Sequence, residues 1–214
     1  MKPVRAQDEV EKIKQKILSS ALDIIVLDGF NALTMRRLAK DIGMTAPNIY
    51  NYFSNKDEIY ITLMTHGFEK LTLVLDTEIN GTKDAYARGK RFMTCYLKFG
   101  LENSSFYEIM FTSSTPKYKD YVGTAHEALF SREHKISMSL AGLALQVVQE
   151  VAVEKGVVVD VEKSKFIMTT LWSVLHGMVS LYNSKNIMYV VDDPESLYYE
   201  IIDKLMGVVD GLYA

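Results

Sequence analysis

The amino-acid sequence predicts an all-α protein, and three observations support this class. Apolar residues recur every three or four positions along most of the 214 residues, which is the spacing of an amphipathic helix. Glycines, prolines and N-capping residues interrupt that pattern where helices would end. The three consecutive valines at 157–159 have no partner strand, so they indicate an extended connection. About nine helices and no sheet are therefore expected.

In the first quarter of the chain, the spacing of apolar residues and the capping residues predict one long helix and two short ones. The long helix covers about residues 8–28 and ends before a glycine. A second helix begins after Thr34, a good N-cap, and ends at Gly43. Thr45 can cap a third helix, whose first turn tolerates Pro47.

The rest of the chain predicts longer helices, whose limits follow from caps and helix breakers. Residues 54–57 have the form of a capping box, so a fourth helix begins near Asn55. The expected segments are helices over 55–79, 82–102 (capped by Thr82), 103–111, 119–155 (interrupted near Gly123) and 162–184, a linker at 112–116, and a last helix from Asp193 and Pro194 to about 211.

The composition is that of a soluble chain in a reducing compartment. One cysteine, Cys95, excludes an internal disulfide and a cysteine-based zinc site. The N-terminus lacks the apolar segment of a secretory signal. Residues 166–184 carry no charge, but their Thr, Ser, His and Asn side chains make them too polar for a lipid-facing helix. A cytoplasmic protein without a membrane partner is expected.

The charge distribution is uneven along the chain. The net charge of −3 comes from 24 Lys and Arg against 27 Asp and Glu, and alone it argues against a protein that coats nucleic acid. Positive charge is nevertheless concentrated between residues 29 and 56, as a specific DNA-binding surface requires. The basic residues there are Arg36, Arg37, Lys40 and Lys56, and the one acid is Asp41.

The two short helices have the pattern of a helix-turn-helix. They follow a longer helix, and Gly43 supplies the positive φ that their tight turn needs. The side chains expected on the outer face of the third helix are short or polar and include no acid, which suits entry into a major groove. These are Thr45, Ala46, Pro47, Asn48, Asn51 and Tyr52. Groups that can meet phosphates flank them: Arg36, Arg37, Lys56 and the Tyr50 hydroxyl.

Residues 34–57 resemble the DNA-binding signature of the tetracycline-repressor (TetR) family. The resemblance rests on Leu38-Ala39, Gly43, Tyr50-x-Tyr52-Phe53 and Lys56. It implies a homodimer whose paired third helices read a palindromic double-stranded operator, with a DNA-binding domain at 1–55 and a ligand-binding and dimerisation domain at 56–214. By resemblance, Thr34 and Arg36 contact phosphate, Thr45 to Asn48 and Asn51 approach bases, and Tyr50, Tyr52 and Lys56 hold the backbone.

A second resemblance lies downstream. Trp172-x-x-x-His176-Gly177 is similar to the signature of one class of TetR C-terminal domain, and Tyr107-x-x-Met110-Phe111 resembles the piece that precedes it. The family often has a cavity at the centre of this domain, which implies a pocket for a small effector. Pocket candidates are Phe92, Cys95, Tyr96, Phe99, Phe106, Met110, Trp172 and His176. Ordinary core packing of the same residues is the alternative.

The helix at 162–184 also has a stripe of small residues opposite a broad apolar face, so it is expected to be buried on two sides. One side would meet the domain core and the other a second subunit, and the last helix would complete a four-helix dimer interface. Interface candidates are Thr169, Ser173, Gly177, Ser180, Leu197, Ile201 and Leu205.

No enzyme motif is found: the sequence has no glycine-rich phosphate loop, no His-Glu-x-x-His, no Gly-x-Ser-x-Gly and no paired metal ligands, so no catalytic residue, metal or cofactor is expected. The expected function is that of a dimeric repressor that leaves its operator when a small, largely apolar or aromatic effector binds. An activator or a protein-controlled regulator with the same DNA head is the first alternative. A cytosolic all-α binding protein or enzyme is a remote one.

Overall fold

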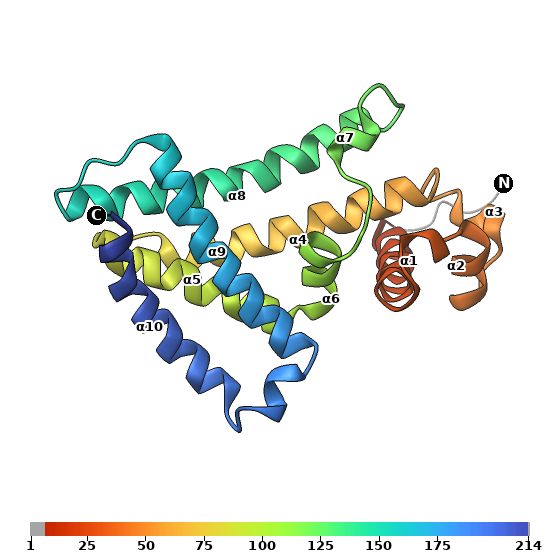
Figure 1. The fold of residues 1–214 in the computed structure, drawn as a ribbon. Coiled ribbons are helices and arrows are strands. Elements are labelled where there is room, and N and C mark those ends of the chain that lie inside the picture. Colours follow the sequence, from red (N-terminus) through yellow and green to blue (C-terminus); the bar gives the residue numbers. More distant parts are fainter. Residues whose placement is uncertain (1–6, 214) are drawn as a thin grey trace. The chain divides into compact units, whose positions relative to one another are not determined.

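The computed structural model describes the backbone of residues 7–213, and the side chains in that range apart from 208–210, 212 and 213. The regular elements of the described range are all helical, which confirms the all-α class, with ten α-helices where about nine were expected (Figure 1). The α-helices are α1 (Gln7–Asp28), α2 (Met35–Asp41), α3 (Ala46–Ile49), α4 (Lys56–Ile79), α5 (Ala85–Glu102), α6 (Ser104–Tyr107), α7 (Tyr118–Tyr121), α8 (Glu127–Glu154), α9 (Val161–Asn183) and α10 (Pro194–Tyr213).

Local sequence signals explain most of these limits. Gly29 and Gly43 have positive φ angles of 82° and 70°, and they end α1 and α2 as predicted. The Oδ1 atom of Asp193 accepts a hydrogen bond from the Ser196 backbone at 3.2 Å, which confirms the predicted cap of α10. The predicted Thr82 cap is wrong, because the carboxylate of Asp84 lies directly before α5 and accepts the backbone N–H of Ala87.

Three short elements depart from the α-helical pattern. A 3₁₀ turn, η1 (Phe30–Ala32), follows α1, and another, η3 (Asn186–Tyr189), follows α9. Between α6 and the 113–117 linker the chain forms a π-helical turn, η2 (Glu108–Thr112). The three valines at 157–159 form no strand, as predicted.

The helices pack into two compact units. Unit 1 contains the residues up to Phe68 together with Ser105–Ile136, and unit 2 contains Glu69–Ser104 and the residues from Ser137 onward. Helices α4 and α8 therefore each contribute one part to each unit. The functional division at residue 55 remains a prediction.

Unit 1 has its core between α1 and the short helices. Helix α1 buries one apolar face, which consists of Ile17, Leu18, Ala21, Leu22, Ile24 and Ile25. The Lys16 ammonium of α1 donates to the carbonyl of Ile42 at 3.0 Å and so caps the end of α2.

In unit 2, helices α5, α9 and α10 pack on one another (Figure 1). Helix α8 joins this core through Val148, Val151 and Ala152, which cluster with Ala85 and Ile167. In the described part of the chain α8 is also the one helix that is long and apolar enough to cross a membrane, a test that core helices of soluble proteins pass as well.

One carboxyl group is buried in unit 1. Glu133 of α8 is 4% exposed, and this burial raises the pKa of its side chain to about 7, although the nearby Lys117 acts to lower it. In the unfolded chain the same carboxyl group ionises near its usual pKa of 4.5. The folded state therefore holds a proton that the unfolded state has already lost between these two values.

Stability should consequently fall as the pH rises from 5 to 8, since ionised Glu133 is penalised only in the folded state. The variant Glu133→Gln cannot ionise, so at pH 8 it should unfold at a temperature roughly 4–8 °C higher than the wild type, for a gain of about 2 kcal/mol. Thermal unfolding followed by circular dichroism at each pH tests this. Glu102→Gln, an exposed carboxylate of α5, is the control. Equal pH profiles for wild type and Glu133→Gln would refute the assignment.

Candidate nucleic-acid interface

Helices α2 and α3 form a helix-turn-helix whose inner face is buried as predicted. The apolar residues expected to point inward are all buried: Met35, Leu38, Ala39, Ile42, Ile49 and Phe53. Thr34 caps α2, since its Oγ1 accepts the backbone N–H of Arg37 at 3.2 Å. The predicted capping by the Thr45 side chain is wrong: Thr45 precedes α3, but its exposed side chain makes no capping hydrogen bond.

The outer face of α3 and its following turn is accessible. Thr45, Pro47, Tyr50 and Asn51 are exposed, while Ala46, Asn48 and Tyr52 are half-buried. The Nδ2 atom of Asn51 donates to Oδ1 of Asn48 at 3.3 Å. This bond holds the two amides side by side and does not use Oδ1 of Asn51 or Nδ2 of Asn48. An acceptor beside a donor matches the edge of adenine in the major groove.

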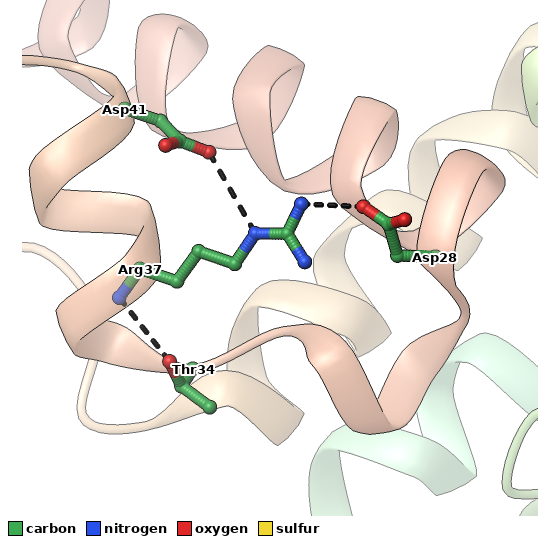
Figure 2. Close-up of polar contacts among 4 residues, drawn as sticks. All are labelled: Asp28, Thr34, Arg37 and Asp41. Atoms are coloured by element: carbon green, nitrogen blue, oxygen red, sulfur yellow. Dashed lines mark hydrogen bonds and ion pairs between the residues drawn. The ribbon is translucent and has the colours of Figure 1, made fainter.

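The predicted phosphate ligand Arg37 is held within the protein (Figure 2). Its Nη2 forms an ion pair with Asp28 at the end of α1, and its Nε lies 4.0 Å from Asp41 of its own helix. Its backbone N–H is the donor to Thr34. Arg37 therefore braces α2 against α1, and two carboxylates offset its charge. The neighbouring Arg36 is exposed and has no such ion pair among the described residues.

Lys56 also has a partner inside the unit. Its ammonium lies 4.3 Å from the centre of the Phe30 ring, a cation–π distance, and its side chain is half-buried. The pairings of Arg37 with Asp28 and of Lys56 with Phe30 were not predicted. The partners lie 9 and 26 positions away along the chain, so helical spacing could not indicate them; the Arg37–Asp41 pair, four positions apart, was recognisable.

The start of α4 fixes the chain directly after the outer face of α3. Both the backbone N–H and the hydroxyl of Ser54 donate to Oε2 of Glu58 at 2.6 Å. In return, the Glu58 backbone donates to Oδ1 of Asn55 at 3.0 Å. The start of the helix near Asn55 is as predicted, but the predicted capping box over 54–57 is wrong: Asn55 caps the helix, and Glu58 takes the place expected for Asp57.

Comparison with known proteins identifies the family. Residues 17–63 match the family described as "Bacterial regulatory proteins, tetR family", and residues 90–205 match "Tetracyclin repressor-like, C-terminal domain". The second match alone covers more than half of the chain. This chain belongs to the TetR family. Membership confirms the resemblance of residues 34–57 to the TetR family and points to a regulator rather than an enzyme, while the Trp-x-x-x-His-Gly class of the C-terminal domain remains a prediction.

Individual TetR-like relatives are distant. An uncharacterized HTH-type transcriptional regulator of Haemophilus influenzae is 27% identical over 109 residues, which are 50% of this chain and 58% of that protein. The HTH-type transcriptional activator FasR of Mycolicibacterium smegmatis is 24% identical over 143 residues, 60% of this chain and 65% of that protein. Each match thus spans less than two thirds of the relative's length. A tetR-family protein of Rhodococcus RHA1 shares the fold, with a TM-score of 0.73 at 14% identity over 92% of this chain and 97% of that one.

The residues proposed for the effector pocket of this TetR protein fall into both units. Six belong to α5 and α9 of unit 2: Phe92, Cys95, Tyr96, Phe99, Trp172 and His176. Phe106 and Met110 belong to unit 1, where they pack against Gly67; a Cβ atom at Gly67 would lie 2.5 Å from the Met110 sulfur. The pocket as a whole remains a prediction.

Within unit 2, Trp172 links two helices. Its Nε1 donates to the Tyr96 hydroxyl at 2.8 Å, and its ring centre lies 6.5 Å from that of His176. The indole is 46% exposed although it makes this bond. Cys95 is buried, which raises the pKa of its thiol and keeps it protonated.

The small-residue stripe of α9 is exposed in the single TetR chain. Thr169, Ser173 and Ser180 are exposed, Gly177 is half-buried, and Phe166 is 58% exposed beside them. The helix is thus buried on one side only within this chain. On α10 the three interface candidates, Leu197, Ile201 and Leu205, are half-buried.

The ion pairs of Arg37 predict a difference between two adjacent arginines. Arg37→Gln should lower the free energy of unfolding by about 1 kcal/mol, because two partly exposed pairs contribute a few tenths to one kcal/mol each. Arg36→Gln should leave it unchanged within about 0.5 kcal/mol. Urea unfolding of both variants measures the difference, and equal losses would show that Arg37 is not a brace.

Proposed function

We propose that the protein is a dimeric, cytoplasmic DNA-binding transcriptional regulator that represses from a palindromic operator and is released by a small, largely apolar or aromatic effector. The observation that carries the proposal is the helix-turn-helix: its apolar face is buried, and its accessible face bears polar groups without an acid.

The contacts with DNA divide into two kinds. The amides of Asn48 and Asn51 are the groups suited to reading a base edge. Exposed Arg36, the Tyr50 hydroxyl (in a side chain 54% exposed) and the uncapped Thr45 hydroxyl are suited to phosphates. We keep three further residues in the proposed interface because of the family resemblance alone: Thr34, Lys56 and the half-buried Tyr52. Arg37 supports the interface by positioning α2.

Dimerisation is needed because a single four-residue recognition helix covers only one half-site. On a palindromic operator, the DNA-binding domains (heads) of the two subunits enter major grooves about 34–36 Å apart. The exposed stripe of α9, with Phe166 beside it, and the half-buried candidates of α10 are the surfaces that a second copy would cover. Effector binding would then favour a spacing of the heads that no longer fits the operator, and a coupling of about 1–3 kcal/mol would change DNA affinity roughly 5- to 150-fold.

Activation is the second candidate, and one observation favours it. The relative FasR, 24% identical, is named an activator. The helix-turn-helix would serve both roles, since the position of the operator relative to a promoter decides between them. A reporter gene placed behind the recovered operator distinguishes the two: expression falls with a repressor and rises with an activator.

Genomic DNA selection with the purified full-length protein tests DNA binding itself. Effector control is tested by screening small apolar compounds for release of the recovered duplex from the protein. A specific duplex should be recovered at moderate salt. Recovery of none would contradict the proposal.

Two variants should then fail in different ways. Asn51→Ala should lose about 1–3 kcal/mol of affinity, or roughly 5- to 150-fold, only for duplexes with the preferred base opposite it. Arg36→Ala should weaken binding to all duplexes and reduce the slope of log affinity against log salt by about one per head. Fluorescence anisotropy over a salt series measures both, and Lys98→Ala on α5 is the control. Loss of discrimination in Arg36→Ala instead would reverse the assigned roles.

A further inference from the structure

The beginning of α4 is held by a segment that comes more than fifty residues later in the chain. The Tyr60 hydroxyl donates to Oγ1 of Thr115 at 2.8 Å and lies 3.1 Å from the carbonyl oxygen of Pro116. The Tyr121 hydroxyl donates to Oδ1 of Asp57 at 2.7 Å. The side chain amide of Asn55 lies 3.2 Å from Nε2 of His126.

These polar contacts surround an aromatic core. The Tyr121 ring stacks on Phe130 of α8, with centres 4.2 Å apart and planes at 17°. Phe130 lies 6.2 Å from Tyr60, which in turn meets Phe30 edge-on at 5.0 Å. Since Lys56 lies over Phe30, the cluster reaches from α8 to the turn that follows α1. Tyr60, Tyr121 and Phe130 are buried.

Burial keeps the two hydroxyl groups in the donor form. It raises the pKa of Tyr60 to about 12 and also raises the pKa of Tyr121, whose ionisation the Asp57 carboxylate opposes further. Both hydroxyls therefore remain protonated throughout the physiological range, and the Tyr121–Asp57 bond has a charged acceptor, which makes it stronger than a neutral hydrogen bond.

We propose that Tyr60, Tyr121 and His126 are positioning residues for DNA binding: with Asn55, Asp57 and Thr115 they form a latch that sets the orientation of the helix-turn-helix. The inference rests on the proposed function. The outer face of α3 is followed directly by the α4 cap, so the group that holds residues 55–60 also holds that face. Residues 115–126, which carry the distant partners of the latch, moreover belong to the same compact unit as the helix-turn-helix.

The latch pre-organises the head, so loosening it should cost affinity without removing any DNA contact. Tyr121→Phe deletes one hydroxyl and keeps the ring that stacks on Phe130. Asp57→Asn keeps an acceptor oxygen for Tyr121. Tyr118→Phe makes the same chemical change three residues away, where the ring stacks on His134 instead.

The experiment has two arms, both on the full-length protein. In the first, hydrogen–deuterium exchange without DNA follows peptides covering residues 34–64. Tyr121→Phe should exchange several-fold faster there, Asp57→Asn, whose acceptor is neutral, should lie between Tyr121→Phe and the wild type, and Tyr118→Phe should match the wild type. In the second, binding to the duplex selected by the wild type should weaken about tenfold in Tyr121→Phe, less in Asp57→Asn and not in Tyr118→Phe, with an unchanged salt slope.

The outcomes distinguish three cases: a latch that positions the helix-turn-helix, a general effect on the stability of the fold, and failure of the proposed DNA-binding function. Wild-type exchange and affinity in Tyr121→Phe would overturn the latch. A lowered melting temperature with a changed salt slope would also overturn it, since that pattern marks general loosening of the fold. If the wild type selects no duplex, the proposed function fails, and the exchange arm still decides whether the latch holds the head.

Discussion

Burial of Ile49 and Phe53 is the interaction on which the recognition segment depends. Helix α3 has only four residues, far fewer than an isolated helix needs in water. Ile49 is completely buried, and Phe53 is buried one turn later, so tertiary packing supplies what the backbone hydrogen bonds of one turn cannot. The positive-φ glycine before α3 and the hydrogen bonds of Glu58 with Ser54 and Asn55 after it then fix the backbone on both sides of the segment.

The cations of the head divide between support and recognition. Arg37 is neutralised by Asp28 and Asp41, and Lys56 rests on an aromatic ring. A count of charges between residues 29 and 56 overstates the positive surface, because Asp28 lies one position outside that window. Exposed Arg36 and Lys40 thus make up a larger share of the accessible positive charge than the sequence suggests. Within residues 29–56, all of which the structure describes, Arg36 and Lys40 are the exposed basic side chains.

Features set by neighbouring residues were predictable from the sequence, and features set by distant ones were not. Gly29, Gly43 and Asp193 act within one turn of their own position, so the limits of α1, α2 and α10 followed from local rules. The Thr82 cap failed because Asp84 competes for the same role two residues later. The inner face of the helix-turn-helix was predicted from helical spacing, and its burial confirms the pattern. The hydrogen bond between Tyr121 and Asp57 joins positions 64 apart in the chain, and helical periodicity cannot predict a contact over that separation.

The packing of the helix-turn-helix bears on how a signal could reach it. A fragment that ended at residue 55 would remove Tyr60 from Phe30 and leave that ring without its edge-on partner. The compact unit instead ends within α4, after Phe68, and takes in the first part of α8. Helices α4 and α8 each contribute residues to both units. A head that folded independently could bind DNA but would be indifferent to the state of the rest of the chain. Sharing two helices makes the DNA-binding unit less autonomous, and the effector control proposed above requires that loss of autonomy.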